Sequence, residues 1–268
     1  MKVLLIGNES FLCQEFIRIL NRKNENYEII TTSRRINKHQ NSIHLDLLSV
    51  DDFLINPPLV DVVIIFAAMT KFIHCRTNIN ESIIVNTIAP LKISKSYIKS
   101  NTKILFLSTN AVFDQKYPLV ESLKSQNGKT KYGQTKINAE KELLNLGNKI
   151  TIIRFSKVFQ RDNNIFCEWK KMLVENKQIL CFNNQFISPI DSEIACEVLY
   201  KLMRFSKGGI YQFSAYNDLS YYDLCLILAQ NHSLETKKVR PISAFSNGLS
   251  KNEVFKYTSL DSKRVNEE

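Results

Sequence analysis

Tyr132 and Lys136 form the residue pair in this sequence whose chemistry is most specific. They lie four residues apart in the segment Lys131-Tyr132-Gly133-Gln134-Thr135-Lys136, so on a helix their side chains share one face. A cation near a phenol stabilises the phenolate, and we therefore expect Lys136 to lower the pKa of Tyr132 toward neutral pH. The spacing alone is weak evidence, because Tyr200 and Arg204 repeat it.

A hydroxyl-bearing segment, Ser108-Thr109-Asn110, follows an apolar run at residues 103–107 that we expect to be a strand. In open α/β sheets the carboxyl ends of parallel strands form the ligand-binding edge, so the Thr109 hydroxyl would lie there. Beside the phenol of Tyr132, that hydroxyl could hydrogen-bond a carbonyl oxygen while Tyr132 protonates it and Lys136 holds the ribose of a nicotinamide. Thr109, Tyr132 and Lys136 are therefore the predicted catalytic residues.

Strand-like and helix-like segments alternate through the first part of the chain. Short apolar runs predict strands, and the run at 60–66 is apolar apart from Asp61, as expected of a strand covered on both faces. The predicted strands are residues 2–6, 27–32, 43–45, 60–66, 103–107 and 150–155, and helices are predicted after residue 10, at 83–97 and at 130–146. This alternation predicts a Rossmann-like, doubly wound parallel sheet of the α/β class.

The alternation fades after residue 159, which suggests two parts. We predict an NADP-binding Rossmann domain at 1–159 and a smaller C-terminal substrate-binding lobe at 160–268. Segment 189–205 is expected to pack back on the Rossmann domain, because its helical stretch is amphipathic. The polar residues from 262 onward are expected to be loose.

Further elements are expected within the second part. Residues 165–175 predict a helix, residues 179–187 an extended stretch and residues 209–213 a strand. A capping box at 220–223 predicts the start of another helix.

Gly7 lies where the first strand meets the first helix, the position at which a doubly wound sheet binds a diphosphate. A complete fingerprint would have two further glycines, but Ser10 and Cys13 occupy those positions, which weakens the expected binding. An ordinary strand-to-helix turn would explain the same residues.

Ser33 and Arg34 follow the second strand, where the adenosine ribose would lie. A hydroxyl with an arginine suits a 2′-phosphate, whereas an acidic residue would suit a 2′-hydroxyl, so NADP(H) is favoured over NAD(H). A solvated basic turn is the alternative. Asp46 could accept a hydrogen bond from the adenine amino group or could cap a helix that begins near Val50.

The composition narrows the class of protein. The chain of 268 residues is 44% hydrophobic, and its formal charge of +10 is scattered without a dense basic tract, so we expect no nucleic-acid partner. No apolar run is long enough to span a bilayer, and we expect a soluble, cytoplasmic protein without a membrane partner. The six cysteines lack metal-ligand spacing, so no metal site is expected.

Several segments together resemble extended short-chain dehydrogenases/reductases, and most of all the dTDP-4-dehydrorhamnose reductase branch. The match covers nearly the whole chain. The similar segments are Phe66-Ala67-Ala68-Met69-Thr70, Val85-Asn86-Thr87-Ile88-Ala89-Pro90, Leu107-Ser108-Thr109-Asn110-Ala111-Val112-Phe113-Asp114, Lys131 to Lys136 and Ile153-Arg154-Phe155-Ser156-Lys157-Val158-Phe159. Similar closing segments are Ser188-Pro189, Gly209-Ile210-Tyr211-Gln212-Phe213-Ser214 and Ser259-Leu260-Asp261-Ser262.

The resemblance implies an NADPH-dependent reductase of the 4-keto group of a nucleotide-linked 6-deoxysugar, acting in nucleotide-sugar and surface polysaccharide biosynthesis. It implies Thr109, Tyr132 and Lys136 as the catalytic set, and it leaves a homodimer open. The cofactor contacts are then Gly7, Ser10, Phe11, Leu12, Ser33, Arg34, Asp46, Leu47, Ala67, Ala68, Thr70, Tyr132 and Lys136, and the substrate contacts Thr70, Thr109, Asn110 and Lys157.

The sequence departs from that branch at three places. Two glycines are missing, Asn110 stands where Asp is usual, and Lys157 replaces a Trp expected near the substrate. The last two changes suggest a sugar or nucleotide different from the dTDP-rhamnose precursors.

Two alternatives remain open. A nucleotide-sugar epimerase or dehydratase would share the catalytic set but would need further acid and base groups. A catalytically silent, NADP-binding regulatory protein of the same fold, like the regulatory subunit of methionine adenosyltransferase, would fit the missing glycines.

Overall fold

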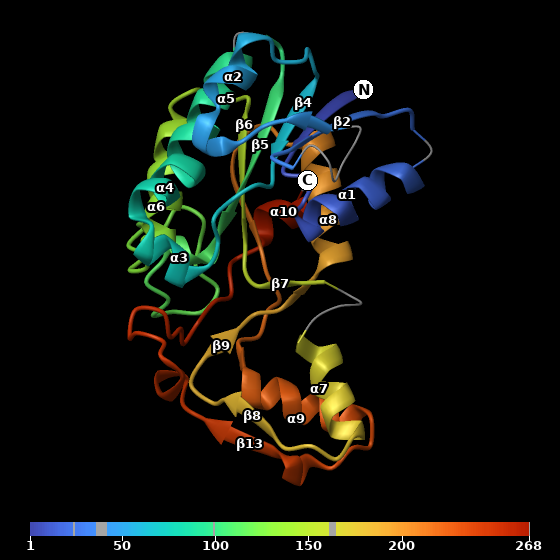
Figure 1. The fold of residues 1–268 in the computed structure, drawn as a ribbon, viewed down its shortest axis with the longest axis vertical. Coiled ribbons are helices and arrows are strands. Elements are labelled where there is room, and N and C mark those ends of the chain that lie inside the picture. Colours follow the sequence, from blue (N-terminus) through green and yellow to red (C-terminus); the bar gives the residue numbers. More distant parts are fainter. Residues whose placement is uncertain (24, 36–41, 99, 161–164, 268) are drawn as a thin grey trace.

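A seven-stranded sheet forms the centre of the molecule (Figure 1). The computed structural model describes residues 1–23, 25–35, 42–98, 100–160 and 165–267. All strand pairs in this sheet are parallel, in the order β11-β6-β5-β4-β1-β2-β3. The strands are β1 (Lys2–Ile6), β2 (Glu28–Ser33), β3 (Ser42–His44), β4 (Val62–Ile65), β5 (Lys103–Thr109), β6 (Ile150–Phe155) and β11 (Gly209–Phe213).

This strand order confirms the predicted Rossmann-like sheet. The chain winds outward from β1 in one direction to β3 and then crosses to β4 on the other side, so the order reverses between β1 and β4. Ligands of doubly wound sheets bind at such a reversal, outside the carboxyl ends of the strands. The side chains of Val62 to Ile65 are all buried, as expected for a strand covered on both faces.

Helices cover both faces of the sheet (Figure 1). One core cluster lies under α1 (Phe11–Arg22), α8 (Ser192–Phe205) and α10 (Lys263–Glu267). The cluster on the opposite face lies under α2 (Asp51–Ile55), α5 (Ala89–Tyr97) and α6 (Lys131–Leu144). These two layers hold the carboxyl ends of β1, β4 and β5 at one edge.

The helix predicted at 83–97 is interrupted. The structure has α3 (Phe72–Thr77), α4 (Ile79–Ile83), a π-helical turn at Ile84–Ile88 and then α5. Pro90 lies in the first turn of α5, where its missing N–H is tolerated. The wide turn places the buried amide of Asn86 toward the loop after β4.

A smaller cluster of elements lies below the sheet in Figure 1, around its own core. It contains α7 (Ile165–Val174), α9 (Tyr221–Asn231), and the strands β8 (Ile179–Phe182) and β13 (Val239–Ile242), which pair in parallel. The short strands β7 (Val158–Phe159), β9 (Phe186–Ile187), β10 (Ile190–Asp191) and β12 (Leu219–Ser220) connect the two regions. The capping box at the start of α9 is present, with Ser220 and Asp223 bonded reciprocally.

The division into domains at residue 160 stays a prediction, and residues 161–164 lie outside the described part of the chain. Segments from the second half return to the large sheet. The helix α8 shares a hydrophobic core with α1, and β11 pairs with β6. No helix within the described ranges is long and apolar enough to cross a bilayer.

The expectation that residues from 262 onward are loose is wrong. Residues Lys263–Glu267 form α10, whose Val265 is buried in the core beneath α1 and α8. Arg264 donates hydrogen bonds to the carbonyl oxygens of Gly208 and Ile210, both at 2.8 Å, and lies over the ring of Tyr211. These contacts fix a polar segment that composition alone suggested was mobile.

Candidate active site and cofactor cavity

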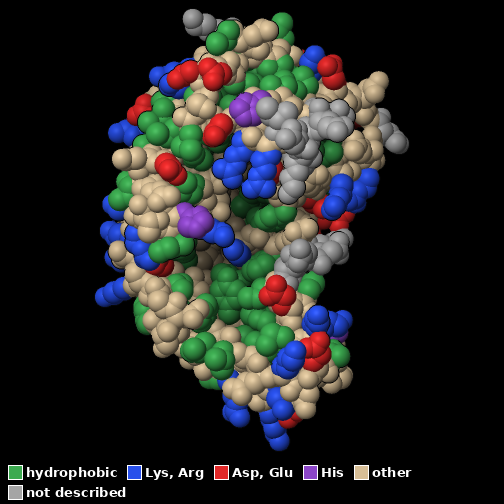
Figure 2. Space-filling view, viewed as in Figure 1, with side chains coloured by type: hydrophobic (Ala, Val, Ile, Leu, Met, Phe, Trp, Pro, Cys, Tyr) green, Lys and Arg blue, Asp and Glu red, His purple; other side chains and the backbone are tan. Residues whose placement is uncertain are grey.

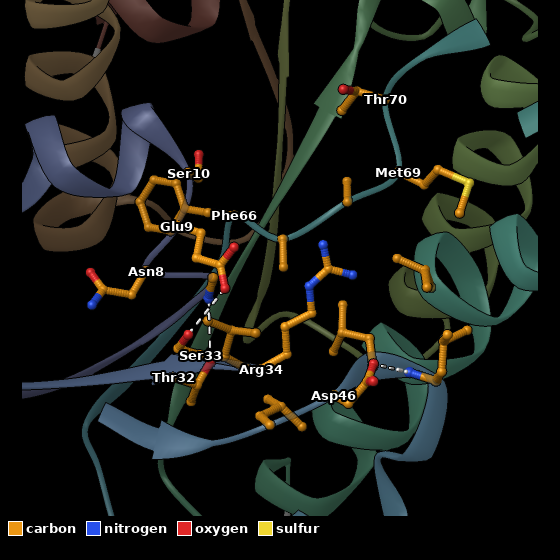
Figure 3. A pocket seen from close by; sticks show the side chains of 18 of the residues that line it. Asn8, Glu9, Ser10, Thr32, Ser33, Arg34, Asp46, Phe66, Met69 and Thr70 are labelled. Atoms are coloured by element: carbon orange, nitrogen blue, oxygen red, sulfur yellow. Dashed lines mark hydrogen bonds between the residues drawn. The ribbon is translucent and has the colours of Figure 1, made fainter. Parts of the chain in front are cut away.

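A cavity of about 600 Å³ opens at the carboxyl ends of β1, β2 and β4 (Figure 3). It lies at the strand-order reversal, where the fold is expected to bind a ligand. Its lining includes ten of the residues predicted to contact the cofactor: Gly7, Ser10, Phe11, Ser33, Arg34, Asp46, Leu47, Ala67, Ala68 and Thr70. Leu12, Tyr132 and Lys136, also predicted as contacts, do not line the cavity, and their cofactor roles stay predictions; the side chain of Leu12 is buried in the core under α1.

Gly7 is the only one of the three expected glycines in the turn after β1, and the structure explains why it is glycine. Its φ is +104°, a conformation that other residues rarely adopt. A Cβ at this position would lie 2.8 Å from the Cβ of Ala67, at the start of the loop after β4. The close approach of these two loops shapes the base of the cavity.

The two missing glycines are replaced without disrupting the turn. Ser10 is the residue before the first turn of α1, and its N–H donates to the carbonyl oxygen of Gly7 at 2.9 Å. Cys13 is fully buried in the core between α1 and the sheet. Since the N-terminus of α1 still faces the cavity, its free N–H groups can hold a diphosphate.

Basic and acidic side chains meet at the end of β2. The guanidinium of Arg34 points into the cavity (Figure 3), and within the described residues it has no hydrogen bond or ion pair. The Ser33 hydroxyl donates to a carboxylate oxygen of Glu9 at 3.2 Å, and Arg35 is paired with the same carboxylate at 3.5 Å. Glu9 lines the cavity and was not singled out by the sequence analysis.

Asp46 caps a helical turn and also faces the cavity, so the two roles considered for it are compatible. One carboxylate oxygen accepts from the N–H of Leu48 at 3.0 Å and begins the short 3-10 turn at Leu47–Ser49. The same side chain lines the cavity, as do Leu47, Ala67 and Ala68.

A buried amide, Asn86, joins the cavity wall to α6. It accepts from the N–H of Met69 at 2.8 Å and donates to the carbonyl oxygen of Met69 at 2.9 Å, which fixes the loop that carries Thr70. It also donates to the hydroxyl of Thr135 at 3.2 Å, three residues after Tyr132. Asn86 therefore fixes the position of Tyr132 relative to the cavity.

The structure brings Thr109 and Tyr132 together. Thr109 is the last residue of β5, and its hydroxyl accepts from the N–H of Ala111 at 3.1 Å. Tyr132 lies in the first turn of α6, which Thr130 caps by accepting from the N–H of Gly133. The Thr109 hydroxyl lies near the Tyr132 phenol and acts to lower the pKa of that phenol.

Lys136 is the most deeply buried member of the predicted set. Its Nζ atom donates to the carbonyl oxygen of Leu107 at 2.9 Å and lies 4.1 Å from the centre of the Phe106 ring. Only 2% of its surface is exposed. The contact joins α6 to the end of β5, two residues before Thr109.

The expectation that Lys136 lowers the pKa of Tyr132 is wrong. Burial raises the pKa of Tyr132 above its ordinary value, the nearby Cys75 raises it further, and only the nearby Thr109 hydroxyl favours the phenolate. Burial also lowers the pKa of Lys136 to about 7, against the attraction of Glu140. Two buried groups each favour their neutral form, so Tyr132 is a protonated donor at neutral pH.

Asn110 and Lys157 are two further predicted substrate contacts. Asn110 follows Thr109 directly, and its side-chain oxygen accepts from the Thr109 hydroxyl at 3.3 Å. Lys157 is exposed beyond β6, with its Nζ atom 5.8 Å from the Phe159 ring. Figure 2 shows this face of the molecule hollowed near its middle, with hydrophobic side chains inside the hollow and Lys and Arg side chains on its upper rim.

The all-parallel sheet and the cavity at its reversal define a Rossmann-like protein of the extended short-chain dehydrogenase/reductase type, as the sequence resemblance implied. The family model described as RmlD substrate binding domain matches residues 1–267. The chain belongs to this family.

Individual relatives agree with this assignment. A dTDP-4-dehydrorhamnose reductase from Aggregatibacter actinomycetemcomitans is 27% identical over 179 residues, which span 63% of this chain and 60% of that relative. A structure of a hypothetical dTDP-4-dehydrorhamnose reductase from Sulfolobus tokodaii is 25% identical with a TM-score of 0.83, covering 100% of this chain and 94% of the other. A dTDP-4-dehydrorhamnose reductase from Bacillus anthracis, solved in complex with NADP, shares the fold at 19% identity with a TM-score of 0.84, covering 99% and 90%.

Proposed function

We propose that this chain is an NADPH-dependent reductase of the 4-keto group of a nucleotide-linked 6-deoxysugar. The observation that supports this most directly is the proximity of the Thr109 hydroxyl to the Tyr132 phenol, on the helix that Asn86 links to Met69 in the cavity lining. Two hydroxyl groups that converge can bind one carbonyl oxygen, and one of them can protonate it. Membership of the RmlD family supports a nucleotide-linked sugar as the substrate class.

The residues of the cavity fit a nicotinamide dinucleotide. Gly7 leaves room for a close backbone approach, the first turn of α1 offers free N–H groups, and Asp46 and Leu47 border the far end. When bound, the nicotinamide supplies the hydride that reduces the carbonyl carbon. We assign the preference for NADPH to Arg34, a cation in the cavity that is suited to a 2′-phosphate.

The chain itself supplies the proton and holds the substrate oxygen. Tyr132, whose raised pKa keeps the phenol protonated at neutral pH, donates its proton to the oxygen as the carbonyl becomes an alcohol. Thr109 donates a second hydrogen bond to that oxygen, and Lys136 fixes the geometry by joining α6 to the end of β5. Asn110, Thr70 and Lys157 are proposed to contact the sugar or its diphosphate.

The same proposal extends to the setting of the reaction. A reductase of this kind acts on a soluble sugar nucleotide in the cytoplasm, as a step in nucleotide-sugar and surface polysaccharide biosynthesis. A homodimer is the oligomeric state that we propose to test by light scattering.

The test is NADPH oxidation with nucleotide-linked 4-keto-6-deoxyhexoses. Tyr132→Phe should lower turnover by a factor of about 10² or more, while the affinity for NADPH stays nearly unchanged. Tyr200→Phe is the matched control: Tyr200 also precedes a basic residue by four positions, but its hydroxyl donates to Glu25 at 2.9 Å, away from the cavity. Turnover that survives in Tyr132→Phe would contradict the assignment.

The alternatives predict different outcomes. Absence of turnover across a panel of such sugars, together with tight binding to a partner enzyme, would favour a regulatory protein. Interconversion of sugar epimers or loss of water without net NADPH consumption would favour an epimerase or dehydratase.

A further inference from the structure

Three aromatic rings form a row that begins at the proposed proton donor. The ring centre of Phe72, on α3, lies 6.0 Å from that of Tyr132. The ring of Phe255, from the segment between β13 and α10, meets Phe72 edge to face at 5.6 Å. Phe72 and Phe255 are both half-buried, so neither side chain is fully covered by the protein. The sequence analysis identified neither residue.

The segment that carries Phe255 is fixed to α3 two residues earlier. One guanidinium nitrogen of Arg76 donates to both carboxylate oxygens of Glu253, each at 2.9 Å. The same carboxylate accepts from the N–H and the hydroxyl of Ser250, at 2.9 and 2.8 Å. Glu253 is 7% exposed, whereas the Arg76 side chain is 45% exposed, so only the carboxylate of this ion pair is shielded from water.

Backbone hydrogen bonds hold Phe255 from the other side. Its N–H donates to the side-chain oxygen of Gln185 at 2.8 Å, and its carbonyl oxygen accepts from the N–H of Phe186 at 2.9 Å. A little further on, Asp218 accepts from the N–H groups of Thr258 and Ser259, at 2.6 and 3.0 Å. The ring of Phe255 is therefore held in place before any ligand binds.

We propose that Phe72 and Phe255 form an apolar wall that receives the C6 methyl group of the sugar and selects 6-deoxysugars over sugars with a 6-hydroxymethyl group. This inference rests on the proposed function. The oxygen bound by Tyr132 is on C4, so its neighbours on C3 and C5 lie within a few bonds of the phenol. C3 carries a hydroxyl, whereas C5 carries C6, and a methyl at C6 is the apolar substituent next to the reacting carbon.

An aromatic wall can discriminate at this position because it offers no hydrogen-bond partner. Burying a hydroxyl against it without a partner costs free energy, whereas a methyl group gains from burial. The discrimination expected from one such difference is on the order of 10- to 100-fold. A preference of this size decides which sugars bind, and a single substitution can abolish it.

The test is calorimetric binding to the NADP⁺-saturated protein of two sugars that carry the same nucleotide, a 6-deoxyhexose and glucose. The thymidine diphosphate and uridine diphosphate series are run in parallel. The wild-type protein should bind the 6-deoxyhexose about 10- to 100-fold more tightly than the glucose compound. In Phe255→Ala the ratio should fall to within about threefold, mainly through weaker binding of the 6-deoxyhexose, whereas Phe255→Leu should keep most of it.

Phe245→Ala is the matched control, since Phe245 is 51% exposed and belongs to the same C-terminal part of the chain. The ratio of its affinities for the two sugar nucleotides should equal that of the wild-type protein. Thermal unfolding of each variant establishes that it is folded. Phe72→Ala removes the other ring of the wall and provides a second, independent test. If both sugars bind and the ratio is unchanged in Phe255→Ala and Phe72→Ala, this inference fails alone. If neither sugar binds the wild-type protein, the proposed function fails as well.

Discussion

The Nζ atom of Lys136 donates to the carbonyl oxygen of Leu107 at 2.9 Å and so links the middle of α6 to the end of β5. Because burial lowers the pKa of Lys136 to about 7, this lysine loses its charge near neutral pH. Tyr132 has a raised pKa and stays protonated over the same range. We therefore expect kcat/KM for reduction to fall as the pH rises through about 7. A rate that is constant from pH 6 to pH 9 would contradict a need for charged Lys136.

The same pKa predicts how stability depends on pH. An unfolded lysine keeps its proton up to a pH of about 10.4, whereas folded Lys136 releases it above about 7. Between these values the unfolded state binds more protons, so the contribution of this residue to stability rises with pH. Lys136→Met should raise the free energy of unfolding at pH 6 by about 1–3 kcal/mol and abolish reduction. Urea unfolding at pH 6 and pH 9 checks this, because the gain should shrink at the higher pH.

Alanine substitutions at Gly7 and Gly147 separate two causes of lost stability, namely backbone strain and steric overlap. Both have positive φ values, +104° and +109°, but a Cβ at Gly147 would meet nothing within 4 Å, whereas one at Gly7 would overlap Ala67. Gly147→Ala should cost about 1–3 kcal/mol of stability from backbone strain alone. Gly7→Ala should cost more and should also weaken NADPH binding, measured by fluorescence titration. Equal stability losses would show that the overlap with Ala67 is relieved without cost.

Arg34 and Arg35 provide a matched pair for cofactor preference. Arg34 points into the cavity, whereas Arg35 is paired with Glu9 at 3.5 Å. Loss of a hydrogen bond to a charged group costs about 1.5–3 kcal/mol, so Arg34→Ala should weaken NADPH binding roughly 10- to 100-fold and NADH binding much less. Arg35→Ala should have the smaller effect on the NADPH to NADH ratio. A larger change from Arg35→Ala would place the 2′-phosphate elsewhere.

Glu140 and Arg154 form an ion pair that is almost completely buried, with 0% and 1% of the side chains exposed. Glu140 also accepts from Ser108, the residue before Thr109. Glu140→Gln leaves the guanidinium of Arg154 without a counter-charge and should cost about 3–5 kcal/mol. Asp51→Asn, which breaks the exposed pair with Lys92, should cost at most about 1 kcal/mol. Thermal unfolding measures both, and similar losses would argue against a structural role for the buried pair.

The sequence predicted those features that depend on local pattern. Buried strands such as β4 were found because every residue is apolar, and the turn at Gly7 because only glycine suits its backbone. The helix at 72–77 was missed because it is too short to show a period. Glu9, Phe72 and Phe255 were missed because their significance comes from partners distant in sequence.

The pKa of Tyr132 marks a second limit of sequence reasoning. Spacing correctly suggested that Tyr132 and Lys136 share a helix, and the structure has both on α6. The spacing could not indicate that burial has a larger effect on the pKa of Tyr132 than Lys136 has. Burial depends on β5 and on Cys75 from another helix. A residue pair in a sequence predicts proximity, whereas the protonation state follows from the whole environment.

The position of α10 affects how the protein can be made by the ribosome. Val265 fills part of the core under α1, and Arg264 bonds to the carbonyl oxygens at the start of β11. An emerging chain therefore cannot complete the core beneath its first helix until α10 has left the exit tunnel. Apolar surface on the earlier segments stays exposed during that time, so nascent chains should depend on chaperones until α10 has emerged.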